Sequence, residues 1–194
     1  MSWFRLEVIE RRGFLANHIG LALIFVSFWL EWLLPDARLN ALTLMGWNLP
    51  GLLTHPFIHG HSLHLGWNLL LLHIFGGLGC NALGPLRYLV AWLTFTLAGA
   101  TGHLLAGGGQ AAGASGVICG FAGLVVAGRL AGTVTLLDAA VRVPVNWLAL
   151  ALVAKDIALA FLPGMGVSVG GHLGGYAVGW LAGAALRRRI SSVQ

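Results

Sequence analysis

Six long apolar stretches alternate with short polar segments along the chain, and they set the predicted architecture. Each is close to the roughly 20 mostly apolar residues that a helix needs to cross a bilayer. They cover about 14–34, 63–79, 86–107, 115–133, 144–162 and 170–187. The pattern predicts an all-α fold: a polytopic membrane protein with six transmembrane helices in one bundle.

The second and fourth stretches carry the features that suit lipid least. His64, Asn68 and His73 interrupt the second, and the fourth begins inside a glycine-rich segment. Polar groups that face lipid are costly because the bilayer core offers them no hydrogen-bond partners. We therefore expect the polar sides of these two helices to face protein or a water-filled cavity.

The composition strengthens the membrane prediction. Hydrophobic residues make up 58% of the chain and charged residues only 9%, and the mean hydropathy is +0.85. A soluble domain carries about 25% charged residues, so too few charges are present here to solvate a globular surface. This excludes a soluble enzyme, a nucleic-acid-binding protein and a disordered protein. Two cysteines, Cys80 and Cys119, do not form a disulfide framework.

The basic residues predict the orientation, because lysine and arginine concentrate in cytoplasmic loops. With six spans, most of the 11 basic residues fall on the side that both termini share, Arg38 and Lys155 excepted. We expect one domain over residues 1–194, with a cytoplasmic segment 1–13 and a basic cytoplasmic tail 187–194. The polar-rich ends of the second, fourth and sixth spans would face outward.

Three polar clusters map to the external half of the membrane. In the first, His64 and Asn68 lie four residues apart and share one helix face. They can present two neutral donors to a single point. A pair of interhelical hydrogen bonds accounts for them equally well.

The second and third clusters are Gly113-Ala114-Ser115-Gly116 and the glycine-flanked His172. A helix that begins at Ser115 offers free backbone N–H groups, which suit a developing oxyanion beside a nucleophilic hydroxyl. Taken singly, Ser115 is also explained as a helix N-cap and His172 as a packed histidine. If they meet, they form a Ser–His dyad without an orienting acid, because no carboxylate lies near His172 in the sequence.

Together these segments, over about 55–180, resemble the rhomboid family of intramembrane serine proteases, which share a six-helix core. His59, His64 and Asn68 match the family's His-x4-His-x3-Asn pattern. Gly113-Ala114-Ser115-Gly116 matches its Gly-x-Ser-Gly motif. His172-Leu173-Gly174-Gly175 with Gly179 matches its His-x2-Gly-x3-Gly motif.

The resemblance implies a role for each matching residue. Ser115 would be the nucleophile and His172 the general base, while His64, Asn68 and the Ser115 backbone N–H would hold the oxyanion. His59 would support the site, and Gly113, Gly116, Gly175 and Gly179 would allow close packing. The substrate would be a transmembrane or membrane-anchored protein, and no cofactor or metal is implied. The resemblance to the bacterial six-helix form also implies a bacterial plasma membrane, and the oligomeric state stays open.

Some positions depart from the family pattern. Cys119 stands four residues after the serine, where rhomboids carry a Phe or Tyr that packs on the catalytic histidine. Phe121 or Trp180 is a candidate replacement. The Trp-Arg pair typical of the first external loop is absent from the short segment of about 35–54.

Lys155 and Asp156 place a charged pair inside the fifth apolar stretch. Neighbours on a helix point about 100° apart, so the two side chains should lie on different faces. We expect both near the external interface, with Lys155 snorkelling toward water. Recognition of a polar substrate feature is the alternative.

Three other functions remain as alternatives. A metal transporter would use the histidines from His55 to His64, but His-Glu-x-x-His is missing and carboxylates are scarce in the spans. A non-catalytic rhomboid relative would bind membrane helices without cutting them, which the altered first loop and Cys119 favour. A rhombosortase-like enzyme would process C-terminal sorting anchors of exported proteins.

Overall fold

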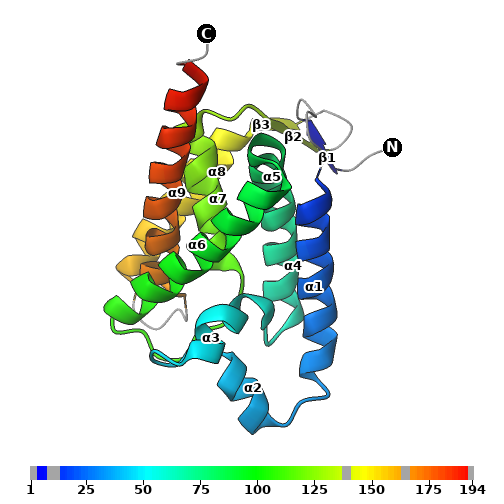
Figure 1. Cartoon of the computed structure of the whole chain (residues 1–194), viewed down its shortest axis with the longest axis vertical. Coiled ribbons are helices and arrows are strands. Elements are labelled where there is room, and N and C mark those ends of the chain that lie inside the picture. Colours follow the sequence, from blue (N-terminus) through cyan, green and yellow to red (C-terminus); the bar gives the residue numbers. More distant parts are fainter. Residues whose placement is uncertain (1–3, 8–13, 137–140, 163–166, 192–194) are drawn as a thin grey trace.

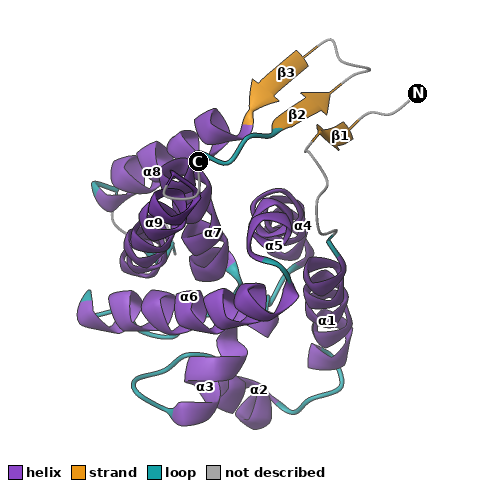
Figure 2. Cartoon of the chain, turned by 45° about the horizontal axis from the view of Figure 1, so that its top comes forward, coloured by secondary structure: helices purple, strands orange, loops and turns teal. Residues whose placement is uncertain are grey.

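Helices make up most of the computed structural model, which describes residues 4–7, 14–136, 141–162 and 167–191 (Figure 2). Six long helical segments coincide with the six predicted apolar stretches to within a few residues. They are α1 (Leu15–Glu31), α4 (Ser62–Leu71) running through the π-helical turn η2 (Leu72–Gly76) into α5 (Gly77–Leu83), α6 (Pro85–Leu105), α7 (Ser115–Gly128), α8 (Val145–Ala160) and α9 (Val169–Ser191).

Two of these segments are long and apolar enough to cross a membrane by length and composition. They are the continuous helix Ser62–Leu83 and helix α6, Pro85–Leu105. The apolar helices Leu15–Glu31 and Ser115–Gly128 are shorter than a full span. The helical fold is as predicted, whereas the count of six spans stays a prediction.

The segment between α1 and α4 contains short helices that the sequence pattern did not predict. They are α2 (Asp36–Leu42), α3 (Leu49–Thr54) and the 3-10 turn η1 (His55–Phe57). The hydroxyl of Thr54 donates to the carbonyl of Leu42 at 2.6 Å and so ties α3 to α2. The backbone N–H of Gly113 donates to the carbonyl of His55 at 2.8 Å, which connects this segment to the start of α7.

A small antiparallel sheet corrects the purely all-α prediction. Its strands are β1 (Phe4–Glu7), β2 (Thr133–Leu136) and β3 (Val141–Pro144), in the order β1-β2-β3. Phe4 pairs with Leu136 and Glu7 with Thr133. Strands of four residues carry almost no periodic signal, and β1 finds its partner far away in the sequence. The sheet lies at the same end of the molecule as the C-terminal end of α9 (Figure 1).

Helix α7 is the centre of the core. Most of its residues from Val117 onward are buried, and it packs against α6, α8 and α9. The ring of Phe121 stacks on Tyr88 at 4.9 Å and meets Phe95 edge-on at 5.1 Å. Aromatic pairs of this geometry add stability beyond the burial of their area.

Glycines let the backbones of α7 and α9 touch. A Cβ on Gly175 would collide with the carbonyl oxygen of Gly116, and a Cβ on Gly179 would collide with that of Gly120. Close approach of this kind is the use of small residues between membrane helices. It fixes α9 against α7 at the level of the residues described next.

Candidate active site

Helix α7 begins at its end away from the sheet (Figure 1), and Ser115 stands at that start. It is the first residue of α7, after Ala114 at the N-cap position. Gly113 just before it has φ +110°, a conformation that favours glycine, and any Cβ there would meet the ring of His64. The first N–H groups of a helix have no partner within the helix. Ser115 therefore combines a hydroxyl with free backbone donors.

His172 lies in the first turn of α9 and meets Ser115 directly. Its Nε2 lies 2.7 Å from the Ser115 hydroxyl oxygen, across 57 residues of sequence. His172 is buried, with a relative exposure of 7% for the whole residue. The predicted encounter of these two residues thus appears in the structure, and the glycine contacts between α7 and α9 make it sterically feasible.

Asp156 is the site residue that the sequence analysis missed. One carboxylate oxygen, Oδ2, lies 3.0 Å from Nδ1 of His172, and the other, Oδ1, lies 2.7 Å from the Lys155 ammonium. The side chain of Asp156 is 2% exposed and that of Lys155 is 48% exposed. Asp156 is therefore buried beside His172, whereas the position of both residues near the external interface stays a prediction.

The spacing of buried residues on α8 explains why Asp156 points inward. Val145, Ala149 and Asp156 are the buried residues of this helix. Intervals of four and seven place all three on one helix face, whereas Lys155 lies about 100° away from it. That face packs toward α7 and α9. Exposed positions of α8, such as Trp147 and Leu150, are apolar as well, so the sequence carried no signal that distinguished this face.

His64 and Asn68 lie on α4, and their hydrogen bonds define which donors remain. The Asn68 amide donates to the carbonyl of His64 at 2.9 Å, so one of its two N–H groups is still available. Nδ1 of His64 lies 3.2 Å from the carbonyl oxygen of His59. Because a carbonyl only accepts, Nδ1 carries the proton of neutral His64, and Nε2 is then an acceptor. Asn68 is the stronger candidate donor.

His59 lies in the loop before α4 and is held by its backbone rather than by its ring. Its backbone N–H donates to Glu31 Oε1 at 2.9 Å, and that of Gly60 donates to Oε2 at 3.0 Å. The ring is 2% exposed and packs against His64 at 5.1 Å. Burial, assisted by the neighbouring His64, lowers the pKa of His59 to about 4. His59 is therefore neutral at pH 7.

The candidate aromatic replacements do not orient His172. Phe121 packs on Tyr88 and Phe95, and Trp180 is half-exposed.

Ligand atoms of Cys119, Asp156 and His172 lie within 4.8 Å of one another, a grouping that could hold a metal ion. Both cysteines are buried and unpaired.

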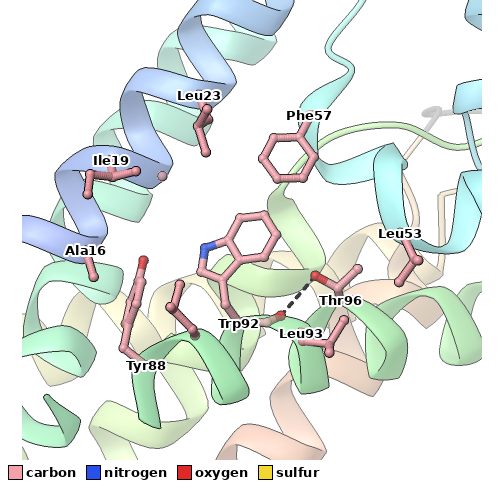
Figure 3. A pocket seen from close by; sticks show the side chains of 11 residues that line it. Ala16, Ile19, Leu23, Leu53, Phe57, Tyr88, Trp92, Leu93 and Thr96 are labelled. Carbon is pink, nitrogen blue, oxygen red and sulfur yellow. Dashed lines mark hydrogen bonds between the residues drawn. The ribbon is translucent and has the colours of Figure 1, made fainter. Parts of the chain in front are cut away.

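An apolar cavity of about 240 Å³ opens elsewhere, between α1, α3, η1 and α6. Figure 3 shows Trp92 projecting into it between Tyr88 and Phe57, and the Phe57 and Trp92 rings stack at 5.3 Å. Ser115, His172 and Asp156 do not line this cavity. It offers few polar groups for chemistry, so the candidate active site is the Ser115 cluster.

Comparison with known proteins agrees with the geometry. A family model described as the Rhomboid domain matches residues 46–189. A search of curated proteins finds no match. The chain belongs to the rhomboid family, whose members are integral membrane proteins.

Proposed function

We propose that this rhomboid-family chain is an intramembrane serine endopeptidase that uses Ser115 as the nucleophile and His172 as the general base. The observation that carries the proposal is the 2.7 Å approach of His172 Nε2 to the Ser115 hydroxyl at the start of α7. A nucleophile within hydrogen-bond reach of a base is the arrangement that activates a serine. Family membership supports the same reaction.

The reaction would proceed through an acyl-enzyme. The Ser115 oxygen attacks the carbonyl carbon of the scissile peptide bond while His172 Nε2 takes the hydroxyl proton. The imidazolium then gives that proton to the leaving amine as the C–N bond breaks. A water molecule, deprotonated by His172, attacks the ester and releases Ser115 and the second product.

The oxyanion formed in each step needs donors fixed in advance. The backbone N–H of Ser115 lies in the first turn of α7, where it has no helical partner. The free amide N–H of Asn68 is the second donor. His64 can add a third through Nε2 only as an imidazolium, because Nδ1 faces the His59 carbonyl. Preorganised donors of this kind contribute much of the catalysis in acyl transfer.

The placement of the site suggests where cleavage occurs. Ser115 is the first residue of α7, and His172 lies in the first turn of α9. Helix α9 runs from there toward the end of the molecule that carries the sheet (Figure 1), where its C-terminal end holds Arg187, Arg188 and Arg189. We propose a six-span bundle with both termini in the cytoplasm and the site open to the external side. Substrates would be transmembrane or membrane-anchored proteins of a bacterial plasma membrane, cut near that surface.

Covalent labelling by a fluorophosphonate tests the proposal without knowledge of the substrate. The full chain is purified in detergent and compared with Ser115→Ala and His172→Ala, with thermal unfolding as a check on folding. We expect labelling of the wild type and none of either variant, because nucleophile and base act as a unit. A folded wild type that takes no label would instead support a non-catalytic relative that binds membrane helices.

A further inference from the structure

His172 has two ring nitrogens, and the reaction proposed above uses only Nε2. The other, Nδ1, lies 3.0 Å from Oδ2 of the buried Asp156. We infer that Asp156 is a positioning residue that converts the Ser115–His172 pair into a serine–histidine–aspartate triad. The inference rests on the proposed function and assigns α8 a part in it.

The packing of α8 holds the carboxylate in place. Asp156 shares its buried helix face with Val145 and Ala149. The hydroxyl of Tyr176, one turn after His172 on α9, donates to the carbonyl of Ala149. This bond ties α8 to the same face of α9 that carries His172. The carboxylate and the imidazole are therefore presented by two helices that are fixed to each other.

The charges around Asp156 suit a carboxylate that stays ionised. An unpaired carboxylate in a protein interior is strongly destabilising, so a buried one needs a cation or several donors. Lys155 provides a cation 2.7 Å from Oδ1 while its own side chain is half-exposed. Oδ2 is left to face His172. When the Ser115 proton moves to Nε2, the new imidazolium lies beside this anion, and no proton passes to Asp156.

The carboxylate also selects the useful tautomer of the neutral ring. An ionised carboxylate only accepts hydrogen bonds, so it favours the form of His172 with its proton on Nδ1. The lone pair then lies on Nε2, toward the Ser115 hydroxyl. The contact has the distance of an ion pair but not the angle of a directed hydrogen bond. Catalytic hydrogen bonds are often poorly aligned before substrate binds.

Labelling kinetics separate a positioning role from a general loss of function. The maximal rate of inactivation, kinact, and the half-saturating concentration, KI, are measured with a fluorophosphonate for the wild type, Asp156→Asn, Asp156→Glu and Ile157→Ala. We expect Asp156→Asn to lower kinact by about 10²–10⁴-fold with KI unchanged, because an amide favours the wrong tautomer. Asp156→Glu, which keeps the charge, should label faster than Asp156→Asn.

Ile157→Ala is the matched control, because it alters the same turn at a half-exposed position and leaves both Asp156 and its Lys155 partner in place. We expect it to change kinact by less than about twofold, because a surface substitution away from the site has little effect. Equal kinact in the wild type and Asp156→Asn would overturn the inference. So would a loss in Ile157→Ala as large as that in Asp156→Asn.

Nitrogen-15 NMR of histidine-labelled protein gives a readout that does not depend on activity. The His172 signals are assigned by their loss in His172→Gln. We expect the wild-type ring to carry its neutral proton on Nδ1 and the Asp156→Asn ring to shift toward Nε2–H. If Asp156→Asn does not fold, the inference is tested by the tautomer of His172 in the wild type and by the labelling rate of Asp156→Glu. A neutral wild-type ring with its proton on Nε2 overturns the inference. An unlabelled wild type with the Nδ1–H tautomer would defeat the proposed function and leave the assignment of Asp156 standing.

Discussion

Two serine–histidine pairs in this molecule have the same separation, and only one has the surroundings of a nucleophile. His172 Nε2 lies 2.7 Å from Ser115, and His103 Nδ1 lies 2.7 Å from Ser168. In both pairs the serine stands at a helix start. The difference lies behind each histidine, where His172 faces a carboxylate and Nε2 of His103 donates to the carbonyl of Gly109 at 2.9 Å.

The second pair shows what a structural serine–histidine contact looks like. Ser168 precedes α9, and its carbonyl accepts the first hydrogen bond of that helix, from the N–H of His172 at 2.9 Å. The His103 ring connects Ser168, at the start of α9, to Gly109 in the loop after α6, and Gly108 packs against the ring. A neutral carbonyl fixes the tautomer of His103 but does not offset the charge of an imidazolium as a carboxylate does. A serine–histidine distance therefore identifies a candidate site only when its neighbours are included.

The largest difference between the two pairs is expected when His172 and His103 are each replaced by glutamine. We expect His172→Gln to lower the cleavage rate of a transmembrane reporter substrate by about 10⁴–10⁶-fold, because the base is lost. His103→Gln should leave cleavage largely intact and cost about 1–3 kcal/mol of stability, because one buried polar group loses a partner. Similar losses of cleavage in the two variants would show that the pairs are not functionally distinct.

Asn68 tests the surroundings of the Ser115–His172 pair, because its amide is the proposed second oxyanion donor there. Asn68→Ala should reduce the maximal cleavage rate by about 10²–10³-fold, the effect of removing one oxyanion donor. His64→Ala should have a smaller effect on that rate, because Nε2 of neutral His64 is an acceptor. Rates are measured with the reporter substrate at saturation. A larger effect for His64 would reverse the assigned order of donors.

Acid should weaken the loop that supports the first pair. Because the pKa of His59 is lowered from 6.5 to about 4 in the folded chain, the unfolded state binds the proton first as pH falls. The neutral His59 ring therefore contributes fully to the free energy of unfolding above pH 6.5. This contribution, up to about 3 kcal/mol, is lost as the pH falls from 6.5 to about 4. Thermal unfolding in detergent at a series of pH values measures how stability depends on pH. His59→Phe should remove the part of this dependence between pH 6.5 and 4. An unchanged dependence in His59→Phe would contradict its attribution to His59.

Glycine contacts hold each pair together, so alanine substitutions test them separately. A Cβ at Gly179 would collide with Gly120 of α7, and a Cβ at Gly102 would collide with Gly170 of α9. Each substitution should cost about 1–3 kcal/mol of stability through overpacking. Gly66→Ala is the control because nothing lies within 4 Å of its Cβ position. In the protein that remains folded, Gly179→Ala should slow labelling more than Gly102→Ala does.

Much of the helical fold could be predicted from the sequence, because long apolar stretches carry their own signal. The helix bounds lie within a few residues of the predicted ones, as at Ser115 and Val145. The short helices α2 and α3 and the four-residue strands were not predicted. Their formation depends on contacts with distant segments, such as the pairing of Phe4 with Leu136.

The candidate site divides in the same way. Ser115, His172 and Asn68 were found because each belongs to a local motif. Asp156 was missed because its contact with His172 depends on the packing of α8 against α7 and α9, which no local pattern specifies. Its adjacency to Lys155 suggested only a charged pair at the external interface, and the contact of its carboxylate with His172 across two helices was not predicted.

The most direct test of the account is to identify the serine that reacts. The wild-type protein is saturated with a fluorophosphonate, digested and mapped by mass spectrometry, with Ser115→Ala and Ser168→Ala treated in parallel. We predict one label per chain on Ser115, no label in Ser115→Ala and full labelling of Ser168→Ala. Label on Ser168, or labelling that persists without Ser115, would contradict the account.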